Sequence, residues 1–361
     1  MLTERRAADR EQKATRDVVV VIPIPNDPDW SIFDEISEDV PIIVIDDSDG
    51  KLAPAPRANV RFFDYAAQER VMGHNYRAQS HKSAATRNFG HYLAYQEGAD
   101  VIIALDYDCR PRPGWLARHT GALGAVSDAP AVSGAWINSI EQPGFYARGY
   151  PYEYRNEHAS AVTETVATGT VKVNMGVWEN VLDLNGVDKV QRDVAGEPVP
   201  THPGLRGAQN YVALGNIPVC GMNTAFTRDL VPAYFFLPDL WIDGWQLSRH
   251  DDIWGGYVLK RLMDKRGDLF RYGTPVVEHT RQSNLQRAMV FEQYMHLMAR
   301  QFFELVDDSA ARIRTDAYAP MFGAFAEAYL GGVERTGAPL HYQRAYRALG
   351  EAMVRWAECF R

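Results

Sequence analysis

The chain lacks the features that mark disulfide-rich, secreted and membrane-spanning proteins. Its 361 residues contain three cysteines, Cys109, Cys220 and Cys359, which are too few and too scattered for a disulfide framework or a zinc site. No stretch approaches the roughly 18 consecutive apolar residues that a membrane span needs, and the charged N-terminus is unlike a signal peptide. We therefore expect a cytoplasmic protein with reduced thiols and no membrane span.

Basic runs and glycine-rich dinucleotide motifs are also missing. The formal net charge is −8 and no run of lysine and arginine occurs, which argues against nucleic acid as a partner. No GxGxxG follows the first apolar run, so a dinucleotide-binding dehydrogenase is not expected. What is present is 46% hydrophobic residues, enough for a substantial core.

Two apolar segments near the N-terminus predict parallel strands. Residues 18–25 and 41–50 each begin with a run rich in valine and isoleucine and end in proline, glycine or acidic residues. Residues 27–36, between them, are expected to form a helix. Strand, helix and strand at this spacing make a βαβ unit, which predicts an α/β fold with a Rossmann-like, mostly parallel sheet.

A third apolar segment, residues 101–109, carries the main candidate site. It reads VIIALDYDC, so Asp106 and Asp108 follow a buried strand at its carboxyl end, where open α/β sheets bind ligands. Two carboxylates around one residue can hold Mg²⁺ or Mn²⁺ through oxygen. The alternative interpretation is two solvated acids in a turn.

Basic and amide side chains suggest further ligand contacts. Lys82 and Arg87 lie near the start of a helix predicted over residues 80–97, where they form either a solvated basic face or a contact to a diphosphate. In residues 216–231, glycine and Asn223 interrupt an apolar run. Such interruptions are typical of backbone close to a ligand, and also of a bulged core strand.

Acids and a histidine occur at the ends of two later elements. Asp251 and Asp252 open a helix predicted over residues 249–265, where they either complement the helix dipole or belong to a site. His279 ends a short strand predicted over residues 273–280. It is either a structural histidine or a metal ligand.

A tyrosine-rich segment, residues 145–157, contains Arg148 and Arg155. Pro151 between them argues against a helix, so both arginines are expected on a loop or an extended strand.

Three regions are expected along the chain. Residues 1–16 have almost no apolar periodicity and should form a mobile arm. Residues 17–284 should form the main α/β domain, and apolar stripes predict helices packed on it over residues 285–361. These stripes are either core positions or a contact between subunits, and in the second case the protein would be a homo-oligomer.

Several segments together resemble the reversibly glycosylated polypeptides, the family that includes plant UDP-arabinopyranose mutases. The resemblance runs from about Val18 to Trp356. Its most specific motifs are KSAATRNFG at 82–90, LDYDC at 105–109, RGYP at 148–151, the spaced Gly176 and Trp178, PVCGMNTAF at 218–226 and RHDDIWGG at 249–256.

The resemblance implies a GT-A-type nucleotide-diphospho-sugar fold, a divalent metal, Mn²⁺ or Mg²⁺, and a UDP-sugar substrate. The implied activity interconverts UDP-arabinopyranose and UDP-arabinofuranose, with self-glycosylation of an arginine that corresponds to Arg148. A second required arginine corresponds to Arg155. Two positions depart from the family pattern: Tyr107 replaces the middle residue of three aspartates, and His250 replaces a tyrosine.

These arguments assign the candidate residues to three groups. The metal ligands are Asp108, Asp106 and His279. The nucleotide-sugar contacts are Asp46, Lys82, Arg87, Asp106 and Asn223, with Asp46 facing the uracil. The catalytic residues are Arg148, Arg155, Asp251 and Asp252.

Two other functions remain open. One is a metal-dependent glycosyltransferase that moves the sugar to an acceptor, with Asp251 or Asp252 as general base. The other is a self-glycosylated scaffold protein without catalytic activity. Arginine is a poor nucleophile because it stays protonated, so Arg148 either binds the sugar covalently or stabilises the departing diphosphate.

Overall fold

The computed structural model describes residues 17–26, 28–53, 57–155, 162–205, 210–282 and 284–361. The arm predicted for residues 1–16 lies outside them.

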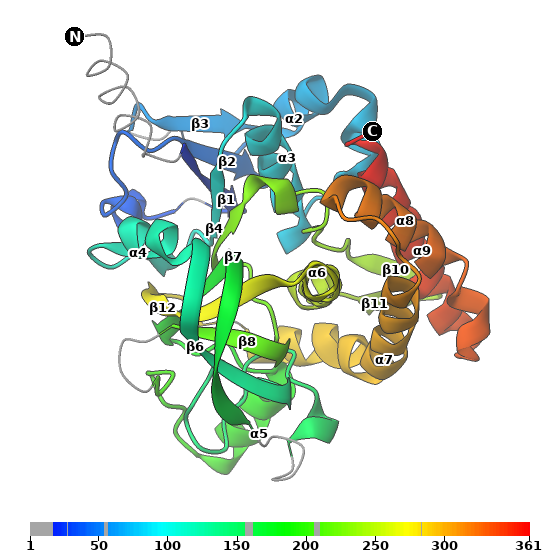
Figure 1. Ribbon diagram of the computed structural model, residues 1–361. Helices are drawn as coiled ribbons and strands as arrows, with labels where there is room; N and C mark the ends of the chain where they lie inside the picture. The colour runs from blue at the N-terminus through cyan, green and yellow to red at the C-terminus, as the bar shows by residue number, and fades with distance from the viewer. Residues whose placement is uncertain (1–16, 27, 54–56, 156–161, 206–209, 283) are drawn as a thin grey trace.

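A large mixed sheet organises the described residues (Figure 1). Its strands are β1 (Val18–Ile24), β2 (Ile42–Asp46), β3 (Val60–Phe63), β4 (Val101–Leu105), β5 (Cys109–Arg110), β6 (Gly124–Trp136), β7 (Thr163–Asn180), β8 (Tyr211–Asn216), β9 (Asn223–Thr227) and β12 (Asp268–His279). Their order is β3-β2-β1-β4-β9-β7-β6-β8-β12-β5, and β7 also pairs with β12. A separate two-stranded sheet joins β10 (Leu240–Ile242) and β11 (Trp245–Leu247). The predicted α/β fold with a central sheet is confirmed.

The first four strands of the sheet are parallel, as the apolar runs predict. Val20 pairs with Ile42, and Val18 pairs with Val101. Strands β2 and β4 are buried along their whole length. This burial on both faces explains why these segments are continuously apolar instead of alternating with polar residues.

The helix expected over residues 27–36 is only a short 3₁₀ turn, Trp30–Phe33. The Asp29 side chain accepts a hydrogen bond from the Ser31 amide and closes this turn. Ile32 and Phe33 are buried within the turn, and Ile36 is buried just beyond it.

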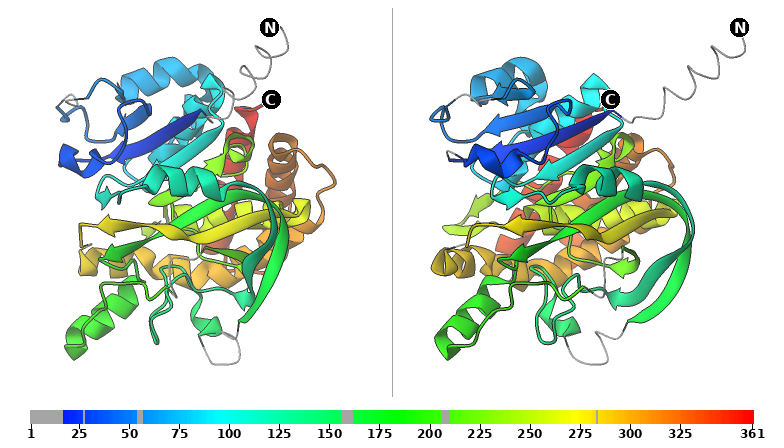
Figure 2. Two further views of the ribbon diagram at one scale, coloured as in Figure 1. Left: turned by 60° about the vertical axis from the view of Figure 1, so that its left-hand side comes forward. Right: turned by 90° about the vertical axis from the view of Figure 1, so that its left-hand side faces the viewer.

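The second half of the sheet contains mostly antiparallel pairs. Strand β9 is antiparallel to both β4 and β7, and β7 is antiparallel to β6. The pairs of β7 with β12 and of β6 with β8 are parallel. Figure 2 shows the long strands β6 and β7 curving away together at one side of the molecule.

The helices are α2 (Tyr65–Met72), α3 (Asn88–Glu97), α4 (Trp115–Ala122), α5 (Gly186–Ala195), α6 (Asp251–Arg266), α7 (Leu285–Ala311), α8 (Tyr318–Leu330) and α9 (Leu340–Glu358). The helix expected over residues 80–97 is α-helical only from Asn88. Ala84–Arg87 form a 3₁₀ turn, which the Ser83 hydroxyl caps by accepting a hydrogen bond from the Ala85 amide.

The C-terminal helices pack on one side of the sheet and share its core (Figures 1 and 2). Trp254 of α6 stacks on Phe302 of α7, with ring centroids 4.1 Å apart. Trp356 of α9 stacks on Phe235 in the same way, at 5.1 Å. The predicted packing helices are therefore confirmed. No helix in the described part of the chain has both the length and the apolarity that crossing a membrane requires.

Candidate active site

Several strands that run in the same direction end at one edge of the sheet. Strands β1, β2 and β4 are parallel, β9 reverses direction between β4 and β7, and β12 is parallel to β7. Asp46 and His279 are therefore the last residues of strands that end at the same edge, and Asp106 and Asp183 follow strands that also end there. Topology alone thus brings together polar residues that are far apart in the sequence.

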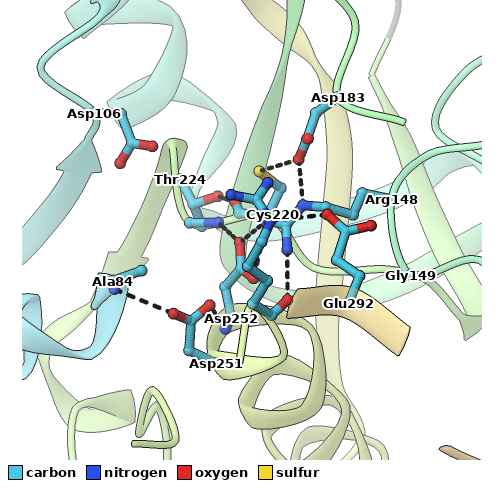
Figure 3. A network of polar contacts seen from close by, with 12 residues as sticks. Ala84, Asp106, Arg148, Gly149, Asp183, Cys220, Thr224, Asp251, Asp252 and Glu292 are labelled. Carbon is cyan, nitrogen blue, oxygen red and sulfur yellow. Dashed lines mark hydrogen bonds and ion pairs between the residues drawn. The ribbon is translucent and has the colours of Figure 1, made fainter. Parts of the chain in front are cut away.

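Arg148 lies at the centre of a buried charge network (Figure 3). Its Nε donates to Asp183 Oδ2 at 2.7 Å, and its Nη2 donates to both carboxylate oxygens of Asp252 at 3.0 and 3.1 Å. Its Nη1 donates to the carbonyl oxygen of Arg249 at 2.7 Å. Arg148 is 9% exposed, so these bonds replace most of its contact with water.

The two carboxylates keep Arg148 charged. Burial alone would lower the pKa of Arg148, but the charges of Asp183 and Asp252 outweigh burial and hold that pKa well above its usual value. Burial likewise opposes ionisation of Asp183, yet Arg148 holds the pKa of Asp183 well below its usual range. All three guanidinium nitrogens of Arg148 donate hydrogen bonds. In this arrangement Arg148 is suited to stabilising negative charge and not to acting as a nucleophile.

The glycine of the RGYP motif allows this arrangement. Gly149 has φ +85°, and a Cβ there would lie 2.5 Å from the Ile253 side chain of α6. The Gly149 amide donates to Asn185 Oδ1 at 2.7 Å. The loop can therefore approach α6 closely only with glycine at this position, which brings Arg148 to Asp252.

Asp251 and Asp252 occupy the first turn of α6 and differ in their surroundings. Asp252 faces Arg148 and also accepts a hydrogen bond from the Gly221 amide at 3.1 Å. Asp251 accepts hydrogen bonds from the amides of Ala84 and Asp252. Burial, together with the charge of Asp252, raises the pKa of Asp251 to about 8. Asp251 therefore carries a proton at neutral pH.

This pKa predicts how stability depends on pH. The unfolded Asp251 carboxyl ionises near pH 4, whereas the folded one keeps its proton up to about pH 8. The stabilisation by the proton is therefore fully present below the unfolded pKa and is lost as pH rises to about 8. The side chain of Asp251→Asn cannot lose a proton. Between about pH 5 and pH 8 the free energy of unfolding of the wild type should therefore fall by at least about 1 kcal/mol more than that of Asp251→Asn.

Urea unfolding at several pH values measures this difference. Asp308→Asn, which changes an exposed acid on α7, is the control and should follow the wild-type curve. Parallel curves for Asp251→Asn and the wild type would show that Asp251 is already ionised in this range.

Arg87 and Asp106 form a second ion pair next to the first network. Arg87 Nη2 donates to Asp106 Oδ1 at 2.6 Å, and Arg87 Nη1 donates to the Gly221 carbonyl at 2.6 Å. Because the Gly221 amide bonds Asp252, one residue joins the two networks. A Cβ on Gly221 would lie 2.6 Å from the Phe236 ring, which explains the glycine in this apolar run. Arg87 is buried and orients Asp106 in this structure.

Lys82 lies against the loop that follows Asp46, the last residue of β2. Asp46 Oδ1 accepts hydrogen bonds from the amide and hydroxyl of Ser48. Lys82 Nζ bonds the Asp47 carbonyl at 2.8 Å and lies 2.9 Å from Asp49 Oδ2, while the Asp47 carboxylate accepts from the Lys82 amide. Lys82 therefore contacts Asp47 and Asp49 of this loop. The contact of Asp46 and Lys82 with a nucleotide remains a prediction.

Asp108 and His279 lie close to each other because β5 pairs with the end of β12. His279 is opposite Cys109 in this pair, and the Thr280 amide bonds the Asp108 carbonyl at 2.8 Å. His279 Nδ1 bonds the Val181 carbonyl oxygen at 2.8 Å, and its Nε2 lies 3.8 Å from Asp108 Oδ2. A histidine whose Nδ1 donates to a carbonyl presents Nε2 as a ligand, so this pair fits a divalent cation.

The pair does not make a complete metal site. Asp106 Oδ1 is bonded to Arg87, and the part of the chain that the structure describes contains no group of three or more histidines, cysteines or acids arranged to hold a metal. A cation at Asp108 and His279 would therefore take its remaining ligands from the substrate and water, as Mg²⁺ and Mn²⁺ often do at phosphate sites.

Two predicted site residues lie outside these networks. Asn223 is fully buried: its Oδ1 faces the ring nitrogens of Trp115 and His119, and its Nδ2 donates to two backbone carbonyls. These bonds use its amide, so the structure gives Asn223 a packing role in place of the predicted ligand contact. Arg155 pairs with Asp188 at 2.9 Å and lies over the Tyr152 ring, and it shares no charged partner with Arg148 among the described residues.

Sequence reasoning did not assign Asp183 or Glu292 to the site. Asp183 follows the carboxyl end of β7, just as Asp106 follows the carboxyl end of β4. The same local pattern could therefore have identified Asp183. Glu292 lies on α7, accepts from the Gly186 amide at 2.6 Å and pairs with Arg249 Nε at 2.8 Å. Nothing local distinguishes Glu292 from the other acids of a long helix, so its burial could only be found from the fold.

Comparison with known proteins identifies relatives of this chain. "Probable UDP-arabinopyranose mutase 2" of Solanum tuberosum is 26% identical over 256 residues, which cover 67% of this chain and 63% of that protein. "UDP-arabinopyranose mutase 1" of Arabidopsis thaliana is 26% identical, with coverage of 67% and 65%. The match thus spans slightly less than two thirds of the length of these relatives.

Solved structures show weaker similarity. Glucosyl-3-phosphoglycerate synthase from Mycobacterium tuberculosis, in complex with Mn²⁺, UDP and phosphoglyceric acid, aligns at a TM-score of 0.41 and 13% identity over 84% of this chain and 82% of that one. Mannosyl-3-phosphoglycerate synthase from Rubrobacter xylanophilus aligns at 0.42 and 12% identity, with coverage of 85% and 79%.

A family model gives the decisive match. The model of the family "Reversibly glycosylated polypeptide" covers residues 13–360. The chain therefore belongs to the reversibly glycosylated polypeptide family.

Proposed function

We propose that this protein is a UDP-sugar mutase that interconverts UDP-arabinopyranose and UDP-arabinofuranose. Family membership and the relatives named as mutases support the substrate and the reaction. The observation that carries the proposal is the buried Arg148, held between Asp183 and Asp252 at the ligand-binding edge of the sheet.

Ring contraction requires a site that stabilises the departing diphosphate and keeps it bound until the bond to the sugar forms again. The bond between the anomeric carbon and UDP breaks, the ring oxygen is exchanged for a different sugar hydroxyl, and the bond to UDP forms again. Negative charge grows on the β-phosphate as the first bond breaks. A fixed cation in a buried site can stabilise that charge without the rearrangement that water would need. Arg148 meets this requirement.

The acids next to Arg148 have separate roles in this proposal. Asp183 and Asp252 hold the guanidinium in one orientation. Asp251, which carries a proton at neutral pH, can hold a sugar hydroxyl or exchange a proton with the oxygen that closes the ring. A divalent cation held by Asp108 and His279 would supply further positive charge to the diphosphate.

The test is incubation of the purified protein with UDP-arabinopyranose and Mn²⁺ in the absence of an acceptor. Chromatography should show UDP-arabinofuranose at a ratio that does not depend on enzyme concentration. Failure of this conversion, with transfer of the sugar to an added acceptor, would instead support a metal-dependent glycosyltransferase. A sugar retained on the protein by intact mass, without either reaction, would support a self-glycosylated scaffold.

The metal assignment predicts a loss of binding. Asp108→Ala removes one of the two cation ligands, and it should weaken Mn²⁺-dependent UDP binding by at least about 10-fold, the lower limit for disturbing a metal shell. Calorimetric titration of UDP with and without Mn²⁺ measures this effect. Asp308→Ala, at an exposed position on α7, is the control. Equal Mn²⁺ dependence in Asp108→Ala and the wild type would refute the assignment.

A further inference from the structure

A pocket of about 320 Å³ opens beside the candidate site. It lies between the end of β7, helix α5 and the segment that leads into α7, and α5 packs against α7. Its inner wall includes Val181, Leu182, Lys189 and Leu285. This volume is at the lower end of the range of about 300–1,000 Å³ that small-molecule sites occupy.

Lys189 is the unusual residue in this pocket. It is 7% exposed, and among the described residues its ammonium makes no hydrogen bond or ion pair. Burying a lysine is costly because its charge is removed from water, and here the charges of Asp183 and Glu292 offset only part of that cost. Burial accordingly lowers the pKa of Lys189. A bound anion would compensate this charge.

The position of Lys189 links the two parts of the candidate site. Val181, its neighbour in the pocket wall, bonds His279 Nδ1, and His279 faces Asp108. On the other side, Lys189 is close enough to Asp183 and Arg148 for their charges to act on it. Residues that line the pocket therefore adjoin both the proposed cation pair, through Val181, and the Arg148 network, through Lys189.

We propose that Lys189 binds the β-phosphate of the UDP-sugar in this pocket, as a cation additional to Arg148. The choice of a UDP-sugar as the ligand rests on the proposed function, whereas the role of Lys189 concerns binding and not turnover. Lysine suits this role because its compact ammonium can meet a phosphate oxygen from one side.

The acids of the pocket are compatible with a bound phosphate. Asp193 and Glu197 are exposed, and Glu197 is paired with Arg192 at 2.9 Å. Exposed acids are screened by water and salt, whereas Lys189 acts at the buried end, where charges interact strongly. Two buried acids, Asp183 and Glu292, also act on Lys189, but they are paired with Arg148 and Arg249.

The test compares UDP with UMP in calorimetric titrations of the full chain. Lys189→Met keeps the length of the side chain and removes its charge. It should weaken UDP binding about 10- to 100-fold, the range for a hydrogen bond to a charged group, and leave UMP binding unchanged. Lys189→Arg should retain most of the UDP affinity. Lys265→Met, an exposed lysine of α6, is the matched control, and circular dichroism confirms that each variant is folded.

The outcomes separate this inference from the proposed function. Loss of UDP affinity in Lys189→Met with unchanged UMP affinity supports the inference, even if the wild type does not interconvert the sugars. Equal loss of UDP and UMP affinity, or no loss of either, overturns it even if the mutase activity is found. Absence of UDP binding in the wild type overturns it as well.

Discussion

Replacing Arg148 with lysine is expected to lower the rate of sugar interconversion about 10²- to 10³-fold, the usual effect of removing one charge contact to a transition state. Lysine keeps the positive charge but loses the planar, forked geometry with which Arg148 bonds Asp183, Asp252 and the Arg249 carbonyl. UDP affinity should change much less than turnover, because charge develops on the phosphate mainly as the bond breaks.

Initial rates of UDP-arabinofuranose formation, measured beside calorimetric UDP affinities, test this prediction. Arg61→Lys, which changes an exposed arginine paired with Glu97, is the control and should leave the rate unchanged. Arg155→Lys belongs in the same series because family resemblance assigns Arg155 a role and the structure places it on Asp188. Wild-type turnover in Arg148→Lys would refute the role proposed for Arg148.

Replacing Asp183 with asparagine is expected to destabilise the protein by about 3 kcal/mol, the lower end of the range for breaking a buried ion pair. The variant leaves Arg148 buried with one carboxylate in place of two, and Asp252 limits the loss. The pKa of Asp183 is depressed, so its stabilisation is present above the unfolded pKa, near 4, and is lost only as pH falls below that value. The effect should therefore be fully visible at neutral pH.

Urea unfolding at pH 7 measures this loss, with an exposed ion pair as the comparison. Glu97→Gln breaks the pair of Arg61 and Glu97, whose side chains are 43% and 40% exposed, and should cost less than about 1 kcal/mol. Similar losses in Asp183→Asn and Glu97→Gln would mean that water reaches the Arg148 network in solution.

Local sequence was sufficient to predict the strands and helices that have a strong apolar pattern. Strands β1, β2 and β4 are continuously apolar because they are buried on both faces, and α7 has buried residues at helical spacing. Helix α6 is buried on all sides from Asp251 to Lys260. Strand β3 and helix α2 were not predicted. Most of β3 is only partly buried, and α2 buries only Gln68 and Met72, so neither has a clear apolar period.

Candidate residues at strand ends could also be predicted, since the carboxyl end of a buried strand is a local feature. Asp46, Asp106, Asp108 and His279 were found in this way, and they lie at one edge of the sheet. Asn223 shows where such reasoning fails. An asparagine that interrupts an apolar run has the same local pattern whether it meets a ligand or, as here, the side chains of Trp115 and His119.

The sequence by itself determined that the chain forms an α/β sheet with acids at the carboxyl ends of its strands, because apolar periodicity and the residues that end a strand are local properties. Only the tertiary structure decided which charges meet. Arg148 pairs with Asp183, 35 residues away, and with Asp252, 104 residues away, because β9 lies between β4 and β7 and α6 begins next to the RGYP loop. The burial of Lys189 and Glu292 was decided in the same way, since α5 and α7 enclose them only after packing on each other. The free energy of a buried charge depends on neighbours that long-range packing brings together, and no local pattern records those neighbours.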